Sequence, residues 1–306
     1  MNMKNLTWIF ILLLTMSCQE EERVPITPKA FPKGGADGVD FHTNFNSQYV
    51  NARHVEVWLP EDYDASSVQK YQVLYMHDGQ NVFNPLTSFN GVDWGVDETV
   101  ERLMREGRIP PTIVVGIWNT SLRFPEYMPQ KPKAFMESQE SVDAMMNDYN
   151  TPIISDNYLK FIVTELKPFI DENYNTSPKR ENTFIMGSSM GGLISLYAIS
   201  EYPEIFGGAG CVSIHWTAWR FGEVYKSQVE AALPDPANHK IYYDYGTRGI
   251  DARYEPHQQE VDEMMKRRGY TSMENWMTRK FEGADHNEES WRDRVHIPLI
   301  FLLNNE

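Results

Sequence analysis

The sequence predicts an α/β fold with a mostly parallel central sheet flanked by helices, built as a single domain over residues 39–306. Short apolar runs alternate along the chain with segments of helical periodicity, which is the pattern of parallel strands joined by crossover helices. The run at residues 112–117 is apolar throughout, as a strand buried on both faces of a sheet is. Active sites in such sheets lie at the carboxyl ends of the strands.

The expected strands and helices alternate in chain order. Alternating apolar and polar residues predict a first strand at residues 54–59, which Pro60 ends. Further strands are expected at residues 71–76, 112–117, 183–186, 208–214, 240–245 and 276–281. Helical spacing of apolar residues predicts helices at residues 96–106, 157–173, 193–199, 256–268 and 291–303. Pro298 should kink or split the last helix, because proline lacks the N–H that a helix interior needs.

The charge of the chain excludes several classes of partner. With 43 acidic and 28 basic residues, the formal net charge is −15 at pH 7. No cluster of lysine and arginine is dense enough to bind a phosphate backbone, so we expect no nucleic-acid partner. Anionic membrane surfaces should repel the protein as well. We therefore expect contact with a membrane only through a lipid anchor.

The first residues have the pattern of an export signal. Lys4 precedes an apolar stretch at residues 6–14, which is too short for the roughly 20 residues that span a bilayer and has the size of a signal-peptide core. The stretch ends at Ser17-Cys18, which resembles the lipobox of bacterial lipoproteins, although Thr15 stands where leucine is usual. We therefore expect a signal peptide at residues 1–17, lipidation of Cys18 and an exported lipoprotein of the outer membrane, on its periplasmic face or at the cell surface. Ordinary secretory cleavage nearby is the alternative.

Residues 18–38 are expected to form a flexible linker between this anchor and the folded domain. They begin with an acidic run and continue with several prolines and glycines but few large apolar groups. The second cysteine of the chain, Cys211, lies in an apolar run that reads as a strand. We expect Cys211 to be a buried structural thiol. With Cys18 lipidated, no disulfide can form within the chain.

The pentapeptide Gly187-Ser188-Ser189-Met190-Gly191 reads G-x-S-x-G between an expected strand and an expected helix. In this strand–turn–helix context the motif lifts a nucleophilic serine clear of the sheet. The sharp turn strains the serine backbone, and the two glycines remove side chains that would clash. We predict Ser189 as the nucleophile and the backbone N–H of Met190 as one donor to the oxyanion. A glycine- and serine-rich loop is the alternative interpretation.

A serine nucleophile needs a base, and the base needs an orienting acid. His286 follows the last expected strand in a loop that contains Gly283, where the chain order serine, acid, histidine places the base. The acid should follow the strand at residues 240–245. Asp251 lies in the glycine-bearing loop after that strand, and Glu255 is the alternative.

The second donor to the oxyanion should come from the loop after an early strand. The loop that begins at Met76 contains Gly79, whose missing side chain would let the backbone approach the substrate. We choose the N–H of Gly79 over that of Gln80. His77 and Asp78 are not expected to bind a metal, because no second histidine or cysteine stands at ligand spacing. No metal and no cofactor are expected.

Four segments together resemble a known family. They are residues 75–81, residues 116–119 with Arg123 and residues 126–129, the G-x-S-x-G motif, and residues 283–288. The chain resembles the esterase family of α/β-hydrolases, which includes carbohydrate esterase family 1 (feruloyl and acetyl-xylan esterases), enterobactin-type esterases and mycolyltransferases. The resemblance implies an α/β-hydrolase fold, with Ser189 as nucleophile, His286 as base and an acid after Gly246-Thr247. The family's more usual acid lies closer behind this Gly-Thr pair than Asp251 does.

Residues 119–154 are expected to form a cap or rim over the site, or else a loosely packed surface insertion. Arg123 could hold a carboxylate or sugar hydroxyls, or could pair with an acid such as Glu126. Aromatic rings near strand ends could stack on a sugar or a phenolic acid, or could belong to the core. The candidates for substrate binding are Arg123, Trp118, His215 and Trp216, and two further tryptophans in such positions are Trp94 and Trp219.

We therefore expect a serine esterase that removes feruloyl or acetyl groups from plant polysaccharide or oligosaccharide fragments at the cell envelope. Its partner is a small-molecule or oligosaccharide ester. A trilactone siderophore esterase is the first alternative, although a strongly acidic protein is a poor host for an anionic ferric siderophore. The others are an acyltransferase and a non-catalytic glycan-binding lipoprotein on the same fold.

Overall fold

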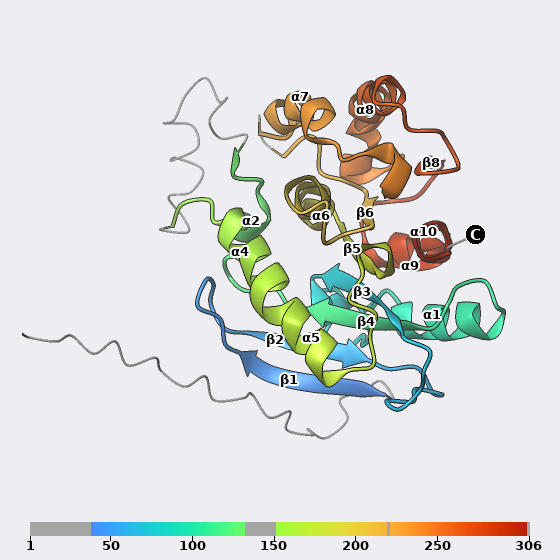
Figure 1. Cartoon of the computed structure of the whole chain (residues 1–306). Helices are drawn as coiled ribbons and strands as arrows, with labels where there is room; N and C mark the ends of the chain where they lie inside the picture. Colours follow the sequence, from blue (N-terminus) through green and yellow to red (C-terminus); the bar gives the residue numbers. More distant parts are fainter. Residues whose placement is uncertain (1–37, 132–150, 219–220, 305–306) are drawn as a thin grey trace, which may run out of the picture.

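The structure is a computed structural model that describes residues 38–131, 151–218 and 221–304 (Figure 1). The expected signal peptide, the lipidation site Cys18 and the linker up to residue 37 lie outside the described residues. So do residues 132–150 of the expected rim, and Trp219. Within the described ranges, no helix is both long and apolar enough to cross a membrane.

The described strands form one eight-stranded sheet in the order β1-β2-β4-β3-β5-β6-β7-β8. They are β1 (Val39–Phe45), β2 (Arg53–Trp58), β3 (Gln72–His77), β4 (Thr112–Ile117), β5 (Thr183–Ser188), β6 (Gly208–Val212), β7 (Lys240–Gly246) and β8 (Trp276–Phe281). The pairs β1–β2 and β2–β4 are antiparallel, and every other neighbouring pair is parallel. The expected mostly parallel sheet is thereby confirmed.

Helices cover both faces of the sheet (Figure 1). One face packs against α1 (Val96–Arg105), α9 (Glu288–Arg294) and α10 (His296–Leu303). The other face packs against α2 (Arg123–Tyr127), α4 (Ser155–Phe161), α5 (Lys167–Asn173), α6 (Met190–Glu201), α7 (Phe221–Ala232) and α8 (Glu255–Arg267). Short helical segments complete the fold: η1 (Gly79–Asn81), η4 (Ile162–Leu166), η5 (Arg180–Asn182), η6 (Pro236–Asn238) and η7 (Gly249–Arg253).

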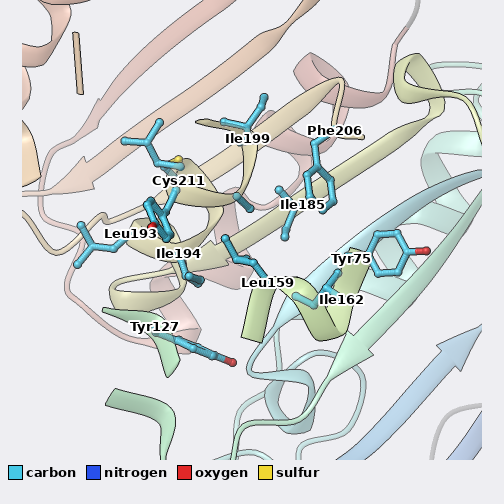
Figure 2. Close-up of a cluster of buried hydrophobic side chains, with 14 of the residues drawn as sticks. Tyr75, Tyr127, Leu159, Ile162, Ile185, Leu193, Ile194, Ile199, Phe206 and Cys211 are labelled. Atoms are coloured by element: carbon cyan, nitrogen blue, oxygen red, sulfur yellow. The ribbon is translucent and has the colours of Figure 1, made fainter. Parts of the chain in front are cut away.

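The two hydrophobic clusters follow from the alternation of side chains along each strand. On β3, Val73 and Tyr75 point into one cluster, whereas Leu74 and Met76 point into the other. Figure 2 shows part of the first cluster, in which side chains of β3, β5 and β6 meet those of α2, α4 and α6. Because β3 is buried on both faces, the apolar character of its run is what a central parallel strand requires.

The first strand of the sheet, β1, was not expected from the sequence. Its buried residues are Val39, His42 and Phe45, so they do not alternate with a period of two. The pairing register with β2 shifts between His42 and Phe45, and such an irregularity breaks the period that identifies a strand. Helices α2 and α7 were not expected either.

The two long helices predicted at residues 157–173 and 291–303 are both subdivided. The first runs from α4 through η4, a π-helical turn, into α5. The second is split into α9 and α10 at Val295, not at Pro298. Pro298 lies in the first turn of α10, where a backbone N–H has no helical partner and its absence therefore costs little.

Candidate active site

Ser189 lies at a sharp turn between the end of β5 and the start of α6. Its backbone adopts φ 58° and ψ −118°, a conformation that costs a non-glycine residue about 1–3 kcal/mol. The turn is held by backbone hydrogen bonds: the Ser189 amide donates to the Val212 carbonyl at 2.9 Å, and its carbonyl accepts from the His215 amide at 3.2 Å. A side chain at Gly187 would lie 3.0 Å from the backbone of Gly191. The structure therefore contains the strained, glycine-dependent turn that the motif predicts.

Asp251 and His286 form a short hydrogen bond. His286 Nδ1 lies 2.5 Å from Asp251 Oδ1, and the Asp251 side chain is fully buried. The other carboxylate oxygen accepts from the Gly246 amide at 2.7 Å and from the Ser213 hydroxyl at 2.6 Å. Burial alone would raise the pKa of Asp251, but the hydrogen bonds from His286, Ser213 and Gly246 outweigh burial and hold that pKa below its ordinary value. Asp251 is therefore ionised where it contacts the imidazole.

Glu255, the alternative acid, lies elsewhere. It begins α8, and its carboxylate pairs with Lys280 at 3.0 Å on the surface. The structure thus places Asp251 in contact with His286 and Glu255 away from it, although Asp251 lies farther behind the Gly246-Thr247 pair than the resemblance led us to expect. The short helix η7 makes this possible, because it turns the chain back under His286 directly after β7.

A buried polar network behind Asp251 was not expected from the sequence. The Ser213 hydroxyl accepts hydrogen bonds from Trp291 Nε1 at 3.1 Å and from Arg294 Nη2 at 2.8 Å. Asp244 in turn accepts from the Ser213 amide at 3.0 Å and from Arg294 at 3.0 Å. These contacts join residues 31 to 81 positions apart in the chain, and no local pattern reports them. They fix the hydroxyl that donates to Asp251.

The three residues predicted as a triad lie at the same edge of the sheet. Ser189 follows β5, Asp251 follows β7 and His286 follows β8, and these strands run in the same direction. His215 connects them: its amide bonds the Ser189 carbonyl, and its ring centroid is 6.3 Å from that of His286. The imidazole of His286 also rests edge-on against Trp291, at 5.1 Å between centroids. The candidate nucleophile, base and acid therefore lie at the same edge of the sheet.

The loop after β3 lies against the Ser189 turn. Asp78 adopts a left-handed backbone (φ 56°) and directly precedes η1. A side chain at Gly79 would come within 2.5 Å of the Gly116 carbonyl carbon, so glycine is required there for packing on β4. Across the described residues, the amides of Gly79 and Met190 donate no hydrogen bond. Both are therefore available to a negatively charged oxygen, as an oxyanion site requires.

Arg123 forms an ion pair with the first residue of this loop, Asp78. Its Nε and Nη2 donate to the two oxygens of Asp78, each at 2.7 Å, and Asn119 adds a third hydrogen bond at 2.5 Å. Burial would raise the pKa of Asp78, but the charge and hydrogen bonds of Arg123 lower it below its ordinary value. The alternative that Arg123 pairs with an acid is confirmed, but the acid is Asp78. It is not Glu126, which forms a buried ion pair with Arg53 at 2.6 Å.

The other residues expected to bind substrate have different surroundings. His215 lies beside His286, and burial together with the charges of His286 and Arg123 lowers its pKa to about 4, so its ring is neutral at pH 7. Trp216 is fully buried and donates to Gln258 at 2.9 Å, so the expectation that it stacks on substrate is wrong.

Two more tryptophans also have protein partners. Trp118 donates to Glu56 at 3.0 Å and packs edge-on against His54 on β2. It therefore lies over the antiparallel edge of the sheet, and no described contact joins it to the triad. Trp94 is buried against Trp291, with 5.4 Å between ring centroids, so it is a core residue.

One group of carboxylates among the described residues is close enough to hold a cation: Asp93, Asp97 and Glu98. Arg292 already pairs with Asp93 and lies 3.6 Å from Glu98, so a positive charge is present there without a metal. The group is not part of the triad.

Comparison with known proteins finds a family model that matches most of the chain. Residues 47–300 match the family Esterase, described as "Putative esterase". YbbA of Bacillus subtilis (strain 168), an uncharacterized protein, is 29% identical over 161 residues, which are 53% of this chain and 56% of YbbA. The chain thus matches little more than half the length of this relative.

Solved structures of esterases share the fold. A ferulic acid esterase of carbohydrate esterase family 1 from Anaeromyces mucronatus, AmCE1/Fae1A, is 19% identical, with a TM-score of 0.57 over 90% of this chain and 96% of that one. The enterobactin esterase FES from Shigella flexneri is 19% identical, with a TM-score of 0.64 over 89% of this chain and 60% of that one. Identities this low show the common fold alone, and the expected α/β-hydrolase fold is confirmed. Since the family match extends over most of its length, the chain belongs to the Esterase family.

Proposed function

We propose that the protein is a serine esterase that hydrolyses carboxylic esters through Ser189, His286 and Asp251. The observation that carries the proposal is the 2.5 Å hydrogen bond between a buried, ionised Asp251 and His286, at the sheet edge where the strained Ser189 stands. A carboxylate on Nδ1 fixes the imidazole tautomer and leaves Nε2 free to accept the serine proton. Family membership supports the same reaction.

The reaction proceeds in two steps. In the first, Ser189 Oγ attacks the ester carbonyl while His286 Nε2 takes the hydroxyl proton, and the amides of Met190 and Gly79 stabilise the negative oxygen. His286 then gives this proton to the departing alcohol, which leaves an acyl-enzyme. In the second step, water loses a proton to His286 and attacks the acyl carbonyl. The bond from the acyl carbon to Ser189 Oγ then breaks, His286 returns the proton to Oγ, and the carboxylic acid is released.

We further propose that the ester is a feruloyl or acetyl group on plant polysaccharide or its fragments. The fold likeness to a ferulic acid esterase supports this substrate. The fold likeness to the enterobactin esterase FES supports a trilactone siderophore as the second candidate. A net charge of −15 counts against an anionic ferric siderophore. Hydrolysis rates of the full-length protein on methyl ferulate, acetylated xylan and a ferric trilactone would show which of the two substrate classes it prefers.

A fluorophosphonate probe tests the nucleophile directly, because it reacts only with an activated serine. We expect the probe to label Ser189, and Ser189→Ala to lower kcat on p-nitrophenyl acetate at least ~10³-fold. Ser188→Ala is the matched control, because Ser188 precedes Ser189 in the same motif. This variant should retain the activity of the wild type. Labelling that persists in Ser189→Ala would refute the assignment, and no labelling at all would favour the non-catalytic glycan-binding lipoprotein. Transfer of the acyl group to an added alcohol in place of water would indicate an acyltransferase.

We propose in addition that the protein is an outer-membrane lipoprotein anchored through Cys18. The support is the sequence around Ser17-Cys18 and the acidic surface, which would not by itself hold the protein at an anionic membrane. Labelling of cells with radioactive palmitate should mark the wild-type chain and leave Cys18→Ala unmarked. Equal labelling of both would show that Cys18 is not the anchor.

A further inference from the structure

A pocket separate from the triad lies at the opposite edge of the sheet. Its volume is about 470 Å³, which is within the roughly 300–1,000 Å³ of small-molecule sites. Two of its lining residues are Lys240, which begins β7, and Met277, the second residue of β8. The pocket therefore lies at the amino ends of the two strands whose carboxyl ends precede Asp251 and His286.

Positive charge is concentrated in this pocket, although the chain as a whole has a net charge of −15. Arg108, Lys240 and Arg279 line the pocket together with one carboxylate, that of Glu274. Burial and nearby arginines lower the pKa of the remaining titratable lining residue, His296, so its ring is neutral at pH 7. Three positive side chains and one carboxylate give the lining a net charge of +2.

Arg279 has no partner among the described residues. It is exposed on β8, and its guanidinium forms neither a hydrogen bond nor an ion pair with any of them. Asp244, its neighbour in register on β7, is fully buried and binds Arg294 at 3.0 Å. All the donors of Arg279 are therefore available to a ligand.

The other two cations of the pocket are weakly compensated. Within the described ranges, Lys240 Nζ donates to the carbonyl of Asn304, which is a neutral group. Arg108 lies 3.8 Å from the carboxylate of Glu106, a distance too long for a hydrogen bond. An anion in the pocket would therefore meet positive charge that no carboxylate already binds closely.

An apolar surface lies beside these charges. It consists of side chains from β8, from α10 and from the segment before β8, namely Met273, Met277, Ile297, Ile300 and Phe301. Met273 is 59% exposed and has φ 70°. A left-handed backbone is costly for methionine, and strain of this kind is concentrated at functional sites. The pocket thus combines cations with an exposed apolar side chain on a strained backbone.

We propose that this pocket binds a phosphate monoester that carries a short apolar chain. A phosphate monoester has a charge of about −1.5 to −2 at neutral pH, which matches the charge of the lining. Arg279 can donate two parallel hydrogen bonds to phosphate oxygens. The chain would cover the apolar residues of β8 and α10 and remove their surface from water. The site is distinct from the triad and goes beyond ester hydrolysis.

Isothermal titration calorimetry of the full-length protein tests the pocket with three probes. Octyl phosphate carries both the charge and the chain, inorganic phosphate carries the charge alone, and octyl glucoside carries the chain on an uncharged head. We expect octyl phosphate to bind with a Kd at least about tenfold lower than that of either other probe.

Two substitutions separate the contributions of charge and chain. Arg279→Gln should raise the Kd of octyl phosphate about tenfold, because a charge-assisted pair of hydrogen bonds is lost. Met273→Asn should raise it about threefold and leave inorganic phosphate binding unchanged, because only apolar contact is lost. Asparagine tolerates the left-handed backbone, and both substitutions replace exposed side chains, so folding should be retained. Thermal unfolding verifies this.

Arg248→Gln is the matched control, because Arg248 is also exposed but follows β7 at the opposite edge of the sheet. It should leave every Kd unchanged. Absence of octyl phosphate binding to the wild type, or an equal Kd in Arg279→Gln, would overturn the site. Inorganic phosphate binding as tightly as octyl phosphate would overturn the role of the chain, and octyl glucoside binding as tightly would overturn the role of the charge. None of these measurements uses an ester, so each result leaves the esterase function standing.

Vesicles distinguish a lipid from a soluble phosphate ester as the source of this group. Wild type that sediments with phosphatidylcholine vesicles only when they contain phosphatidate, together with Arg279→Gln that does not, would assign the phosphate to a lipid. Wild type that binds octyl phosphate but sediments equally with both kinds of vesicle would assign it to a soluble ester.

Discussion

Replacing Arg123 by methionine should destabilise the loop after β3, which begins with Asp78. Asp78 would lose two hydrogen bonds of 2.7 Å from a cation and keep only the bond from Asn119. Removing one partner of a buried ion pair costs about 3–5 kcal/mol. Because the Arg123 side chain is 33% exposed and that of Asp78 is 10% exposed, solvent screening lowers the expected loss to about 2–4 kcal/mol in the free energy of unfolding.

The loss should depend on pH in a defined direction. In the wild type the folded pKa of Asp78 lies below its ordinary value, so its stabilisation is complete above the unfolded pKa of about 4 and is lost only as the pH falls through the folded pKa. Without Arg123, burial dominates and raises the pKa of Asp78. The ionised carboxyl is then penalised at pH 7 and relieved by protonation in more acidic solution. The difference in unfolding free energy between variant and wild type should therefore shrink from pH 7 to pH 5.

Urea unfolding at the two pH values measures this difference. Arg267→Met is the matched control, because Arg267 binds Glu230 with the same two-bond geometry, at 3.0 and 2.6 Å, but both side chains are exposed. An exposed pair contributes at most about 1 kcal/mol. If Arg123→Met loses no more than this control, or loses the same amount at pH 7 and pH 5, the ion pair does not hold the loop and the reasoning is wrong.

Two further substitutions test the remaining parts of the site. Asp251→Asn should lower kcat about 10³–10⁴-fold on p-nitrophenyl acetate because the imidazole loses its orienting charge, whereas Glu255→Gln should change it less than about twofold; similar losses in both variants would contradict the assignment of the acid. Gly79→Ala should lower kcat more than it raises KM, because a side chain 2.5 Å from the Gly116 carbonyl carbon must displace the segment proposed to bind the oxyanion. Unchanged kcat in a folded Gly79→Ala protein, verified by circular dichroism, would place the oxyanion donor elsewhere.

The parts of the fold that the sequence predicts are those with a local signal. The turn at Ser189 is written in five consecutive residues, and β4 appears as one uninterrupted apolar run. By contrast, β1 is a strand whose buried residues follow no period of two, because its pairing with β2 is irregular. This strand forms because it pairs with β2, and such a pairing cannot be read from the local sequence of β1.

The same distinction applies to the site. His286 could be predicted from its place after the last strand, and Asp251 from the loop after β7. The position of Trp216 could not be predicted, because the local sequence is the same whether a tryptophan at a strand end lines a pocket or donates to Gln258 inside the core. The ion pair between Arg123 and Asp78 joins residues 45 positions apart. No local pattern predicts it, because only folding brings the two side chains together.

Backbone strain is concentrated where the chemistry is proposed to occur. Among the described residues, five non-glycine residues have positive φ, and three of them, Asp78, Ser189 and Ser213, directly follow the neighbouring strands β3, β5 and β6. Each costs of the order of 1–3 kcal/mol and persists only if its surroundings impose it. Arg123 imposes it on Asp78, and the carboxylate of Asp244, which accepts from the Ser213 amide, does so on Ser213. In the proposed mechanism these contacts also hold the segment that carries the Gly79 amide and the Ser213 hydroxyl that donates to Asp251, so weakening either of them should lower kcat.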